Sequence, residues 1–264
     1  MDQHFRAFSF VDRITAMTPK NIAGAYAIPE RISAFPASLV AEAVGQLAAW
    51  SAMASTNFQR RPVAGLAAKI ELLDSVRPGQ LLELSADLQS VDDEAIAYGG
   101  VAHAQGKPII RLHDCVGHMV LVTDFDDPQA LRDRFSLLCG PGADAGGFPG
   151  TPLLTLEPQN GETAGPTGHQ LRAAFRVPSS APFFADHFPR RAVFPGSLLM
   201  HMNLELAAAL ACQIPTPTPN ALWRLASVSD VKLRTFIEPG EQLECESRLS
   251  ERSDHHAIVA VETR

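Results

Sequence analysis

The chain has 264 residues, which is enough for one large domain or for two domains of about 100 to 150 residues. Hydrophobic residues make up 46% of it and charged residues 19%, a composition that excludes a disordered or fibrous protein. The net charge of -7 disfavours nucleic-acid binding, which needs a basic surface to neutralise phosphates. No apolar stretch approaches the length of a membrane span, and charges interrupt the N-terminal residues, so we expect a cytoplasmic protein.

The first long predicted helix covers residues 36–54, with the sequence PASLVAEAVGQLAAWSAMA. Its only long polar side chains are Glu42 and Gln46, which lie four residues apart and therefore on one face. A helix that is apolar on every other face is typical of a protein interior. Because burial of a lone carboxylate is costly, Glu42 either has a partner, serves a site, or lies on a narrow stripe that faces solvent.

Two segments of alternating hydrophobicity follow this helix, separated by Pro78 and Gly79, which are typical of a turn. The alternation predicts two strands, and we expect them to form a hairpin. We expect a second hairpin from the two alternating segments on either side of Pro239 and Gly240, which are also typical of a turn. Residues 126–150 then begin as a short helix and become rich in Gly and Pro, which indicates a linker. No C-x-x-C motif occurs, so we expect four free cysteines. We expect no metal site, because alternate residues of a strand point to opposite faces, as would His113, Asp114, Cys115 and His118.

The second half of the chain repeats the first. AFPASL at 34–39 returns as VFPGSL at 193–198, with equivalent prolines 159 residues apart, and VRPGQLLELSADL returns as IEPGEQLECESRL, with prolines 161 residues apart. Two matches at nearly the same offset indicate a duplication. Each copy contains one long helix, the second at 195–212, and several antiparallel strands, which predicts an α+β fold. We place the N-terminal copy at 1–125, the linker at 126–150 and the C-terminal copy at 151–264.

The stretch FFADHFPRRAVFPGSLLMH, residues 183–201, resembles the histidine loop of the 3-hydroxyacyl-[acyl-carrier-protein] dehydratases. FSFVDRI at 8–14 is similar to the N-terminal segment of that family, and EAVGQ at 42–46 is similar to its helix motif. The resemblance implies the hot-dog fold, in which a curved antiparallel sheet wraps a long helix. The duplication then implies a double hot dog, packed as a pseudo-dimer within one chain.

In the family, the histidine and the acid of one active site come from different subunits. The resemblance therefore assigns His187 of the second copy and Glu42 of the first to one catalytic site. A second, mirror-image site would be inactive, because Ile28 stands eight residues before Pro36 where a histidine is needed and His201 replaces the acid. Glu205 stands where the first helix has Gln46, and we expect it to form a structural hydrogen bond with His201, four residues before it. Whether the histidine and the acid each move one proton, or the histidine moves both, stays open.

Other residues are candidates for substrate binding. The backbone N–H at Gly196 is expected to bind the thioester oxygen, where glycine allows close approach, and Gln46 is expected to hold Glu42. The aromatic side chains that either line an acyl tunnel or belong to the core are Phe183, Phe184 and Phe188. The arginines that either bind an acidic carrier protein or are simply solvated are Arg190 and Arg191 at the loop, and Arg60 and Arg61 after the first helix.

The resemblance implies dehydration of a 3-hydroxyacyl thioester to a trans-2-enoyl thioester, in fatty-acid or polyketide-like biosynthesis and without a cofactor. The substrate would be carried by acyl carrier protein or coenzyme A, and several pseudo-dimers could form a homo-oligomer. Two alternatives stay open. One is an acyl thioesterase on the same fold, and the other is a non-catalytic subunit that binds acyl chains.

Overall fold

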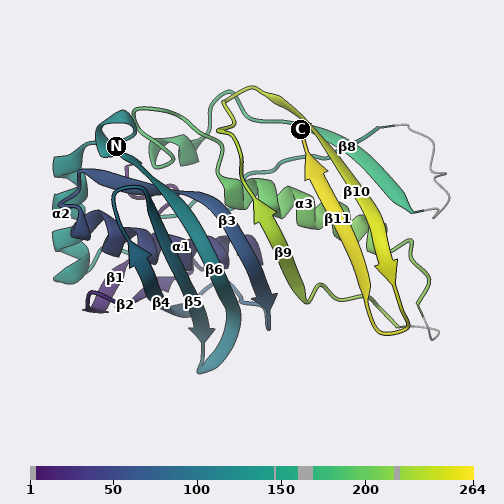
Figure 1. The fold of residues 1–264 in the computed structure, drawn as a ribbon, viewed down its shortest axis with the longest axis horizontal. Coiled ribbons are helices and arrows are strands. Elements are labelled where there is room, and N and C mark those ends of the chain that lie inside the picture. The colour runs from purple at the N-terminus through teal and green to yellow at the C-terminus, as the bar shows by residue number, and fades with distance from the viewer. Residues whose placement is uncertain (1–3, 146, 160–168, 217–220) are drawn as a thin grey trace. The chain divides into compact units, whose positions relative to one another are not determined.

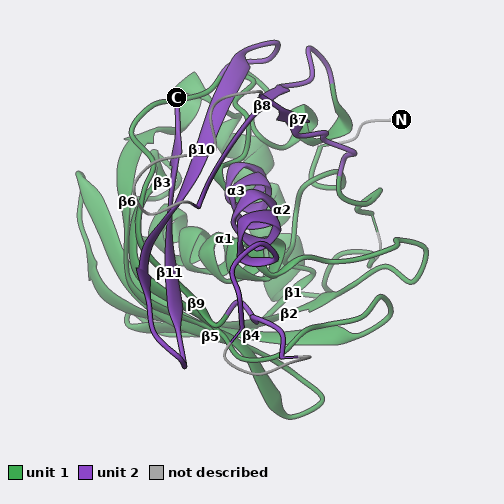
Figure 2. Cartoon of the chain, turned by 90° about the vertical axis from the view of Figure 1, so that its right-hand side faces the viewer, with its two compact units in different colours: residues 1–151, 181–197, 226–237 green, residues 152–180, 198–225, 238–264 purple. Residues whose placement is uncertain are grey.

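The computed structural model describes residues 4–145, 147–159, 169–216 and 221–264. Gly146 of the expected linker, and residues 160–168 and 217–220 of the expected C-terminal copy, lie outside this description. The chain forms two compact units, each built from segments that are distant in sequence (Figure 2). Unit 1 comprises residues 1–151, 181–197 and 226–237, and unit 2 comprises residues 152–180, 198–225 and 238–264. The division into two hot-dog copies joined by a linker stays a prediction.

Unit 1 contains a seven-stranded antiparallel sheet in the order β1-β2-β4-β5-β6-β3-β9. Its strands are β1 (Arg13–Met17), β2 (Asn21–Ala27), β3 (Arg60–Leu72), β4 (Leu81–Val91), β5 (Ala95–Ala104), β6 (Lys107–Leu121) and β9 (Ser227–Lys232). After β6 the chain forms a 3-10 turn, η1 (Val122–Asp124), and a helix, α2 (Pro128–Cys139), which contacts β1. The strand β9 comes from the second half of the sequence.

The long helix α1 (Ala37–Ser55) lies along one face of this sheet and contacts β2 to β6 (Figure 1). It confirms the helix predicted over residues 36–54. Twelve of its nineteen residues are buried, as expected of a helix that is apolar on nearly every face. Gly100 of β5 permits this close packing, since a Cβ atom there would lie 2.5 Å from Val44 of the helix.

The expected hairpins are not present, although their Pro-Gly turns are. Gly79 has φ of +83° and Gln80 donates to the Arg77 carbonyl at 3.2 Å, which closes the turn. However, β3 pairs with β6 and β9, and β4 pairs with β2 and β5. The hairpin prediction was wrong because alternation and a turn define strands and a reversal, but do not define which strands pair.

Unit 2 contains a four-stranded antiparallel sheet in the order β11-β10-β8-β7. Its strands are β7 (Glu157–Pro158), β8 (Gln170–Arg176), β10 (Gln242–Arg252) and β11 (Ala257–Thr263). The second long helix, α3 (Gly196–Ala211), confirms the helix predicted over 195–212; its first two residues belong to unit 1 and the rest to unit 2. Thr263 of β11 donates to Asn203 of α3 at 2.8 Å.

The duplication is visible in the backbone hydrogen bonds around the two Pro-Gly turns. The Ile28 carbonyl accepts a hydrogen bond from the N–H of Gly79 at 3.0 Å, and the Ile28 N–H donates to the carbonyl of Gln80 at 2.9 Å. In the same way, the Val177 carbonyl accepts from the N–H of Gly240 at 3.1 Å, and the Val177 N–H donates to the carbonyl of Glu241 at 2.8 Å. Gly79 and Gly240 also share a positive φ, of +83° and +85°. Ile28 and Val177 are therefore equivalent positions of the two copies.

This equivalence corrects the alignment of Ile28 with His187. Pro36 follows Ile28 by eight residues, whereas Pro195 follows Val177 by eighteen. The second copy therefore carries a loop that is longer by ten residues, and His187 lies in it. The first copy has no position equivalent to His187, because it lacks the loop and not merely the histidine.

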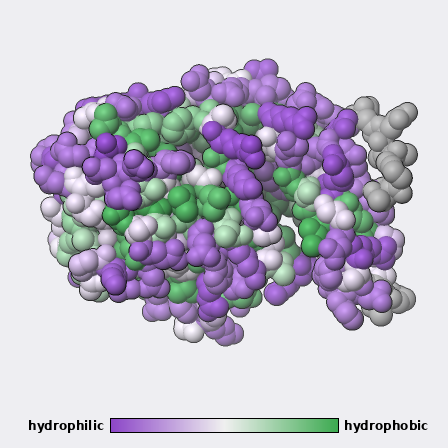
Figure 3. Space-filling view, viewed as in Figure 1, coloured by the Kyte–Doolittle hydropathy of each residue, from purple (hydrophilic) through white to green (hydrophobic). Residues whose placement is uncertain are grey.

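Other expectations concern the surface and the sulfur chemistry. All four cysteines are free, as predicted. No helix among the described residues is both long enough and apolar enough to cross a membrane. Hydrophobic and hydrophilic side chains are mixed on the face drawn in Figure 3, and the exposed hydrophobic residues of the large sheet include Leu66, Leu81 and Leu121.

Candidate active site

The loop of residues 181–197 belongs to unit 1 and holds His187 in one orientation. It opens with a short 3-10 helix, η2 (Pro182–Ala185), and the His187 N–H donates to the Phe183 carbonyl at 2.9 Å. The ring nitrogen Nδ1 lies 2.9 Å from the carbonyl oxygen of Val193. Because a carbonyl can only accept, Nδ1 carries the proton and Nε2 of the neutral ring carries the free lone pair. Nε2 is therefore the atom of His187 that can act as a base.

The surroundings of His187 favour its neutral form. The half-buried ring meets Phe8 edge-on, with centroids 5.8 Å apart, and stacks on Phe188 at 4.1 Å. Burial lowers the pKa of His187 below its ordinary value, and the charge of Arg61 lowers it further. The Glu42 carboxylate acts in the opposite direction. The imidazole is thus neutral near pH 7 and has a negative charge at hand to stabilise it once it gains a proton.

Glu42 lies on the partly exposed face of α1, where Gln46 holds it. The Gln46 side-chain nitrogen donates to Glu42 Oε1 at 3.0 Å and to the Phe8 carbonyl at 2.9 Å. Its oxygen accepts the N–H of Phe10 at 2.8 Å, which fixes the orientation of the amide. Glu42 is half-buried and has a hydrogen-bond partner, so its carboxylate is neither fully buried nor alone.

Arg61 of β3 is the residue of this site that sequence reasoning placed on the surface. Its side chain is only 13% exposed and pairs with Asp126, Nη1 to Oδ2, at 3.2 Å. Its guanidinium carbon lies 4.0 Å from the ring centroid of Phe188. Burial lowers the pKa of Arg61 to about 10, against the charges of Asp126 and Glu42, so the side chain remains charged at neutral pH. Strand alternation in the sequence could have predicted this position, because successive side chains of a strand point to opposite faces: Arg61 points inward and its neighbour Arg60 points outward.

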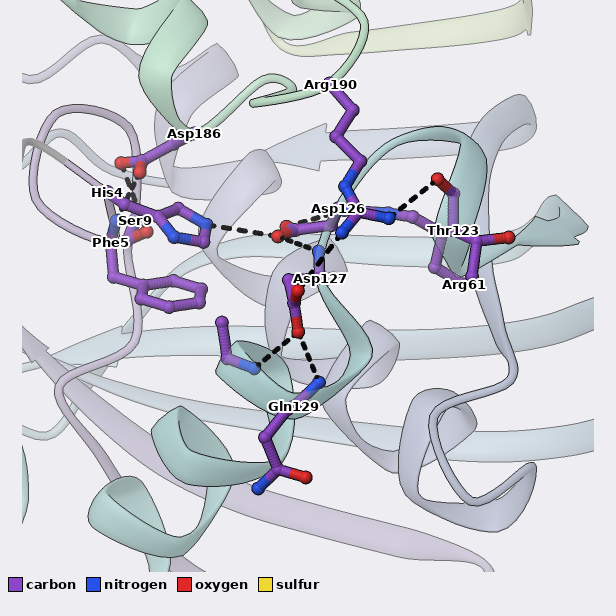
Figure 4. Close-up of polar contacts among 11 residues, drawn as sticks. His4, Phe5, Ser9, Arg61, Thr123, Asp126, Asp127, Gln129, Asp186 and Arg190 are labelled. Atoms are coloured by element: carbon purple, nitrogen blue, oxygen red, sulfur yellow. Dashed lines mark hydrogen bonds and ion pairs between the residues drawn. The ribbon is translucent and has the colours of Figure 1, made fainter.

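Two aspartates, the half-buried Asp186 and the buried Asp126, attach the N-terminal segment to the loop and its surroundings (Figure 4). Asp186, next to the histidine, accepts hydrogen bonds from the N–H groups of Phe5 and Phe8, the latter at 2.6 Å, and from Ser9 Oγ at 3.3 Å. Burial raises the pKa of Asp186. Asp126 is 3% exposed, and its Oδ1 lies 3.3 Å from Nε2 of His4.

Gly196 is the first residue of α3, where backbone N–H groups have no partner within the helix. A Cβ atom on it would lie 2.4 Å from Cδ1 of Leu233. The side chain of Leu233 therefore fills the space over this glycine, which gives a packing reason for a glycine here; close approach of a substrate stays a prediction. Next to it, the Ser197 hydroxyl is buried and has no hydrogen-bond partner among the described residues.

The three phenylalanines of the loop differ in their surroundings. Phe183 is 3% exposed and packs near Phe8, with ring centroids 6.1 Å apart. Phe188 is 6% exposed and meets Phe125 edge-on at 5.3 Å. Phe184 is only half-buried. Phe183 and Phe188 thus anchor the loop in the core, and Phe184 is the one of the three with exposed surface for an acyl chain.

The two arginines of the loop are engaged within unit 1. Arg190 donates to the Thr123 carbonyl and to Asp127 Oδ2, both at 3.1 Å. Arg191 is exposed, and its guanidinium carbon lies 4.8 Å from the ring centroid of Phe236. Asp127 offsets part of the charge of Arg190, so Arg191 is the more available cation for an acidic partner.

The residues of the expected inactive site lie on α3 in unit 2. His201 is half-buried and Glu205 is exposed. No hydrogen bond between the two side chains occurs in the described part of the chain.

The fold of the whole chain has a counterpart among solved structures. A protein from Lactobacillus plantarum, described as an oleoyl thioesterase, superposes with a TM-score of 0.57 and 10% sequence identity, over 92% of this chain and 89% of that one. With its antiparallel sheets and two long helices, the chain is an α+β protein of the double hot-dog class, as predicted.

Sequence comparisons then point to one family within this class. Residues 163–263 match the ApeI-like family, described as ApeI dehydratase. The 3-hydroxyacyl-[acyl-carrier-protein] dehydratase FabZ of Tolumonas auensis is 36% identical over 74 residues, which are 28% of this chain and 49% of that protein. FabZ of Albidiferax ferrireducens is 36% identical over 84 residues, 31% of this chain and 56% of that protein. The chain thus spans about half the length of these relatives, and parts of it are similar to the ApeI-like family and to the 3-hydroxyacyl-[acyl-carrier-protein] dehydratases.

Proposed function

We propose that the protein catalyses the reversible dehydration of 3-hydroxyacyl thioesters to trans-2-enoyl thioesters. One observation carries the proposal: Phe8 connects a histidine with a free Nε2 to a glutamate held by Gln46, since its ring meets the His187 ring at 5.8 Å and its carbonyl accepts from Gln46 at 2.9 Å. This pair provides a base and an anchoring carboxylate in a half-buried site. The similarity to dehydratases supports the same reaction.

In the proposed mechanism His187 moves both protons. Nε2 removes the proton from the carbon next to the thioester carbonyl, and the resulting imidazolium is stabilised by the charge of Glu42. The Glu42 carboxylate accepts a hydrogen bond from the 3-hydroxyl and so holds it near the ring. The imidazolium then returns its proton to the departing hydroxyl, which leaves as water. Only protons are transferred, so the mechanism calls for no cofactor.

Negative charge develops on the thioester oxygen as the first proton leaves. The N-terminus of α3 offers donors for it, namely the backbone N–H of Gly196 and the buried Ser197 hydroxyl. Both belong to unit 1, as does His187. We assign these groups to the thioester oxygen.

For the substrate carrier we propose acyl carrier protein, with coenzyme A as the alternative. Carrier proteins of this kind would approach the exposed side of the loop, where Arg191 offers a positive charge. The acyl chain would contact Phe184. The pathway would be the biosynthesis of fatty acids or of polyketide-like chains, in the cytoplasm.

The test is hydration of a crotonyl thioester, on carrier protein and on coenzyme A, followed by loss of enoyl absorbance. We expect His187→Ala and Glu42→Gln each to reduce kcat by about 100-fold or more. His201→Ala is the matched control, because this histidine is also half-buried but lies on α3 outside the proposed site, and it should leave the rate unchanged. Full activity in His187→Ala would refute the mechanism, and release of free thiol in place of hydration would indicate a thioesterase.

A further inference from the structure

Arg61 is a buried cation beside the proposed catalytic pair, and none of the steps above uses it. Its guanidinium lies over the ring of Phe188, which directly follows His187 in the loop. Phe188 in turn packs against Phe125 and Val193, the residue whose carbonyl holds Nδ1 of His187. One side chain of β3 therefore contacts the short segment that orients the histidine.

The neighbouring arginine shows what an ordinary position on this strand looks like. Arg60 is 34% exposed, and its Nε lies 4.0 Å from the exposed carboxylate of Asp93. Arg61 is 13% exposed, and its partner Asp126 is 3% exposed. Burial of a charged pair costs several kcal/mol, and a pair of well-packed apolar side chains would often be at least as stable. Stability alone thus does not account for a charge at position 61.

The charge acts on both members of the pair. The Glu42 carboxylate on α1 favours the charged form of Arg61, and Arg61 disfavours the charged form of His187. The other ionisable groups around the loop are Asp186, which is tied to backbone N–H groups, and Asp126 with its partner His4. The loop itself carries Arg190, which pairs with Asp127, and Arg191, which lies over Phe236. Among these groups Arg61 provides the positive charge that opposes protonation of His187.

We propose that Arg61 is a positioning residue of the active site: its guanidinium, stacked on Phe188 and paired with Asp126, holds the histidine loop and places a positive charge against the residue that follows His187. The inference rests on the proposed function for its catalytic meaning, because a general base must be unprotonated to act. Asp126 then has the role of keeping the guanidinium in place while it faces the loop. Arg60 has no such role.

The experiment measures the titration of His187 directly, by NMR of its ring protons, with His187→Gln to assign the signal. The variants are Arg61→Met, which removes the charge and keeps a long apolar side chain, and Arg61→Lys, which keeps the charge. Because Arg61→Met leaves Asp126 buried and unpaired, the double variant Arg61→Met/Asp126→Asn provides a second, neutral replacement. Arg60→Met is the matched control on the same strand.

We expect the His187 midpoint to move to higher pH in Arg61→Met and in the double variant, and to stay in place in Arg60→Met and Arg61→Lys. If the protein is active, the acid limb of its kcat/KM profile should also move to higher pH in Arg61→Met. The decrease in kcat/KM relative to wild type should then be greater at pH 6 than at pH 8, by roughly threefold or more. An unchanged midpoint in the folded double variant would overturn the inference. The titration needs no turnover, so a wild-type protein that hydrates no thioester would refute the proposed function without deciding the role of Arg61.

Discussion

Gly196 at the start of α3 tests whether packing or substrate access demands a glycine there. The substitution Gly196→Ala adds one methyl group, which would lie 2.4 Å from Cδ1 of Leu233. Carbon atoms in contact are ordinarily about 3.5–4.0 Å apart, so Leu233 must move by more than 1 Å or change rotamer. The first copy has Ala37 at the equivalent position, which shows that the helix start itself accepts alanine.

The expected cost follows from this overlap. Overpacking by a methyl group destabilises by about 1–3 kcal/mol, and alanine recovers ~1 kcal/mol through its helix propensity, which leaves a net cost of about 0–2 kcal/mol. Leu233→Ala removes the obstacle but also loses a half-buried side chain, at about 1–2 kcal/mol. Urea denaturation of the two single variants and of the double variant Gly196→Ala/Leu233→Ala gives the coupling between the two sites.

If packing explains the glycine, the double variant is more stable than the sum of the single effects predicts, by about 1–2 kcal/mol. Its hydration activity should also be close to that of Leu233→Ala, because alanine keeps the backbone N–H that the proposed mechanism uses. Additive stabilities would refute the steric argument. A double variant that is stable but inactive would instead support the original expectation that the substrate approaches the glycine closely.

Two further substitutions test half-buried polar groups of unit 1. Burial raises the pKa of Asp12 to about 6, so its contribution to stability is fully present below pH 4 and is lost as the pH rises through 6. Asp12→Asn should therefore stabilise the protein more at pH 8 than at pH 5. The difference in the free energy of unfolding should be ~1–2 kcal/mol once solvent screening of this partly exposed group is allowed for. An equal change in Tm at pH 5 and pH 8 would contradict this. Gln46→Leu removes the donor to Glu42 and leaves the Phe8 carbonyl and the Phe10 N–H without their side-chain partner. We expect the free energy of unfolding to fall by about 2–4 kcal/mol in thermal or chemical denaturation, and kcat to fall as well. Gln46→Glu keeps an acceptor for the Phe10 N–H but loses the donor to Glu42 and Phe8, so it separates the loss of the donor from the loss of the acceptor.

The elements that the sequence predicted well are those with strong local signals. The helix over 36–54 has no polar face wide enough for a surface helix, and the structure contains it as α1. The turns at Gly79 and Gly240 were predicted because proline followed by glycine suits a reversal with positive φ. Glu42 and Gln46 were placed on one face by their spacing alone, and a hydrogen bond joins them.

The elements that it predicted poorly depend on partners distant in the chain. The strands on either side of Gly79 alternate as a hairpin would, yet two other strands lie between them in the sheet. The inward direction of Arg61 depends on Phe188 and Asp126, which are far away in sequence. The same holds for Gly196, whose neighbour Leu233 lies 37 residues later. Local patterns specify secondary structure, whereas these features arise only when the chain has folded.

The N-terminal segment shows why two motifs that are far apart in sequence serve one site. The Phe8 carbonyl accepts a hydrogen bond from Gln46, the residue that holds Glu42, while the Phe8 N–H donates to Asp186, the residue before His187. The Phe8 ring also contacts the His187 ring edge-on. One residue of the FSFVDRI segment thus has hydrogen bonds to the partner of the acid and to the neighbour of the base. Through these contacts the N-terminal segment connects the histidine loop to the helix that carries Glu42.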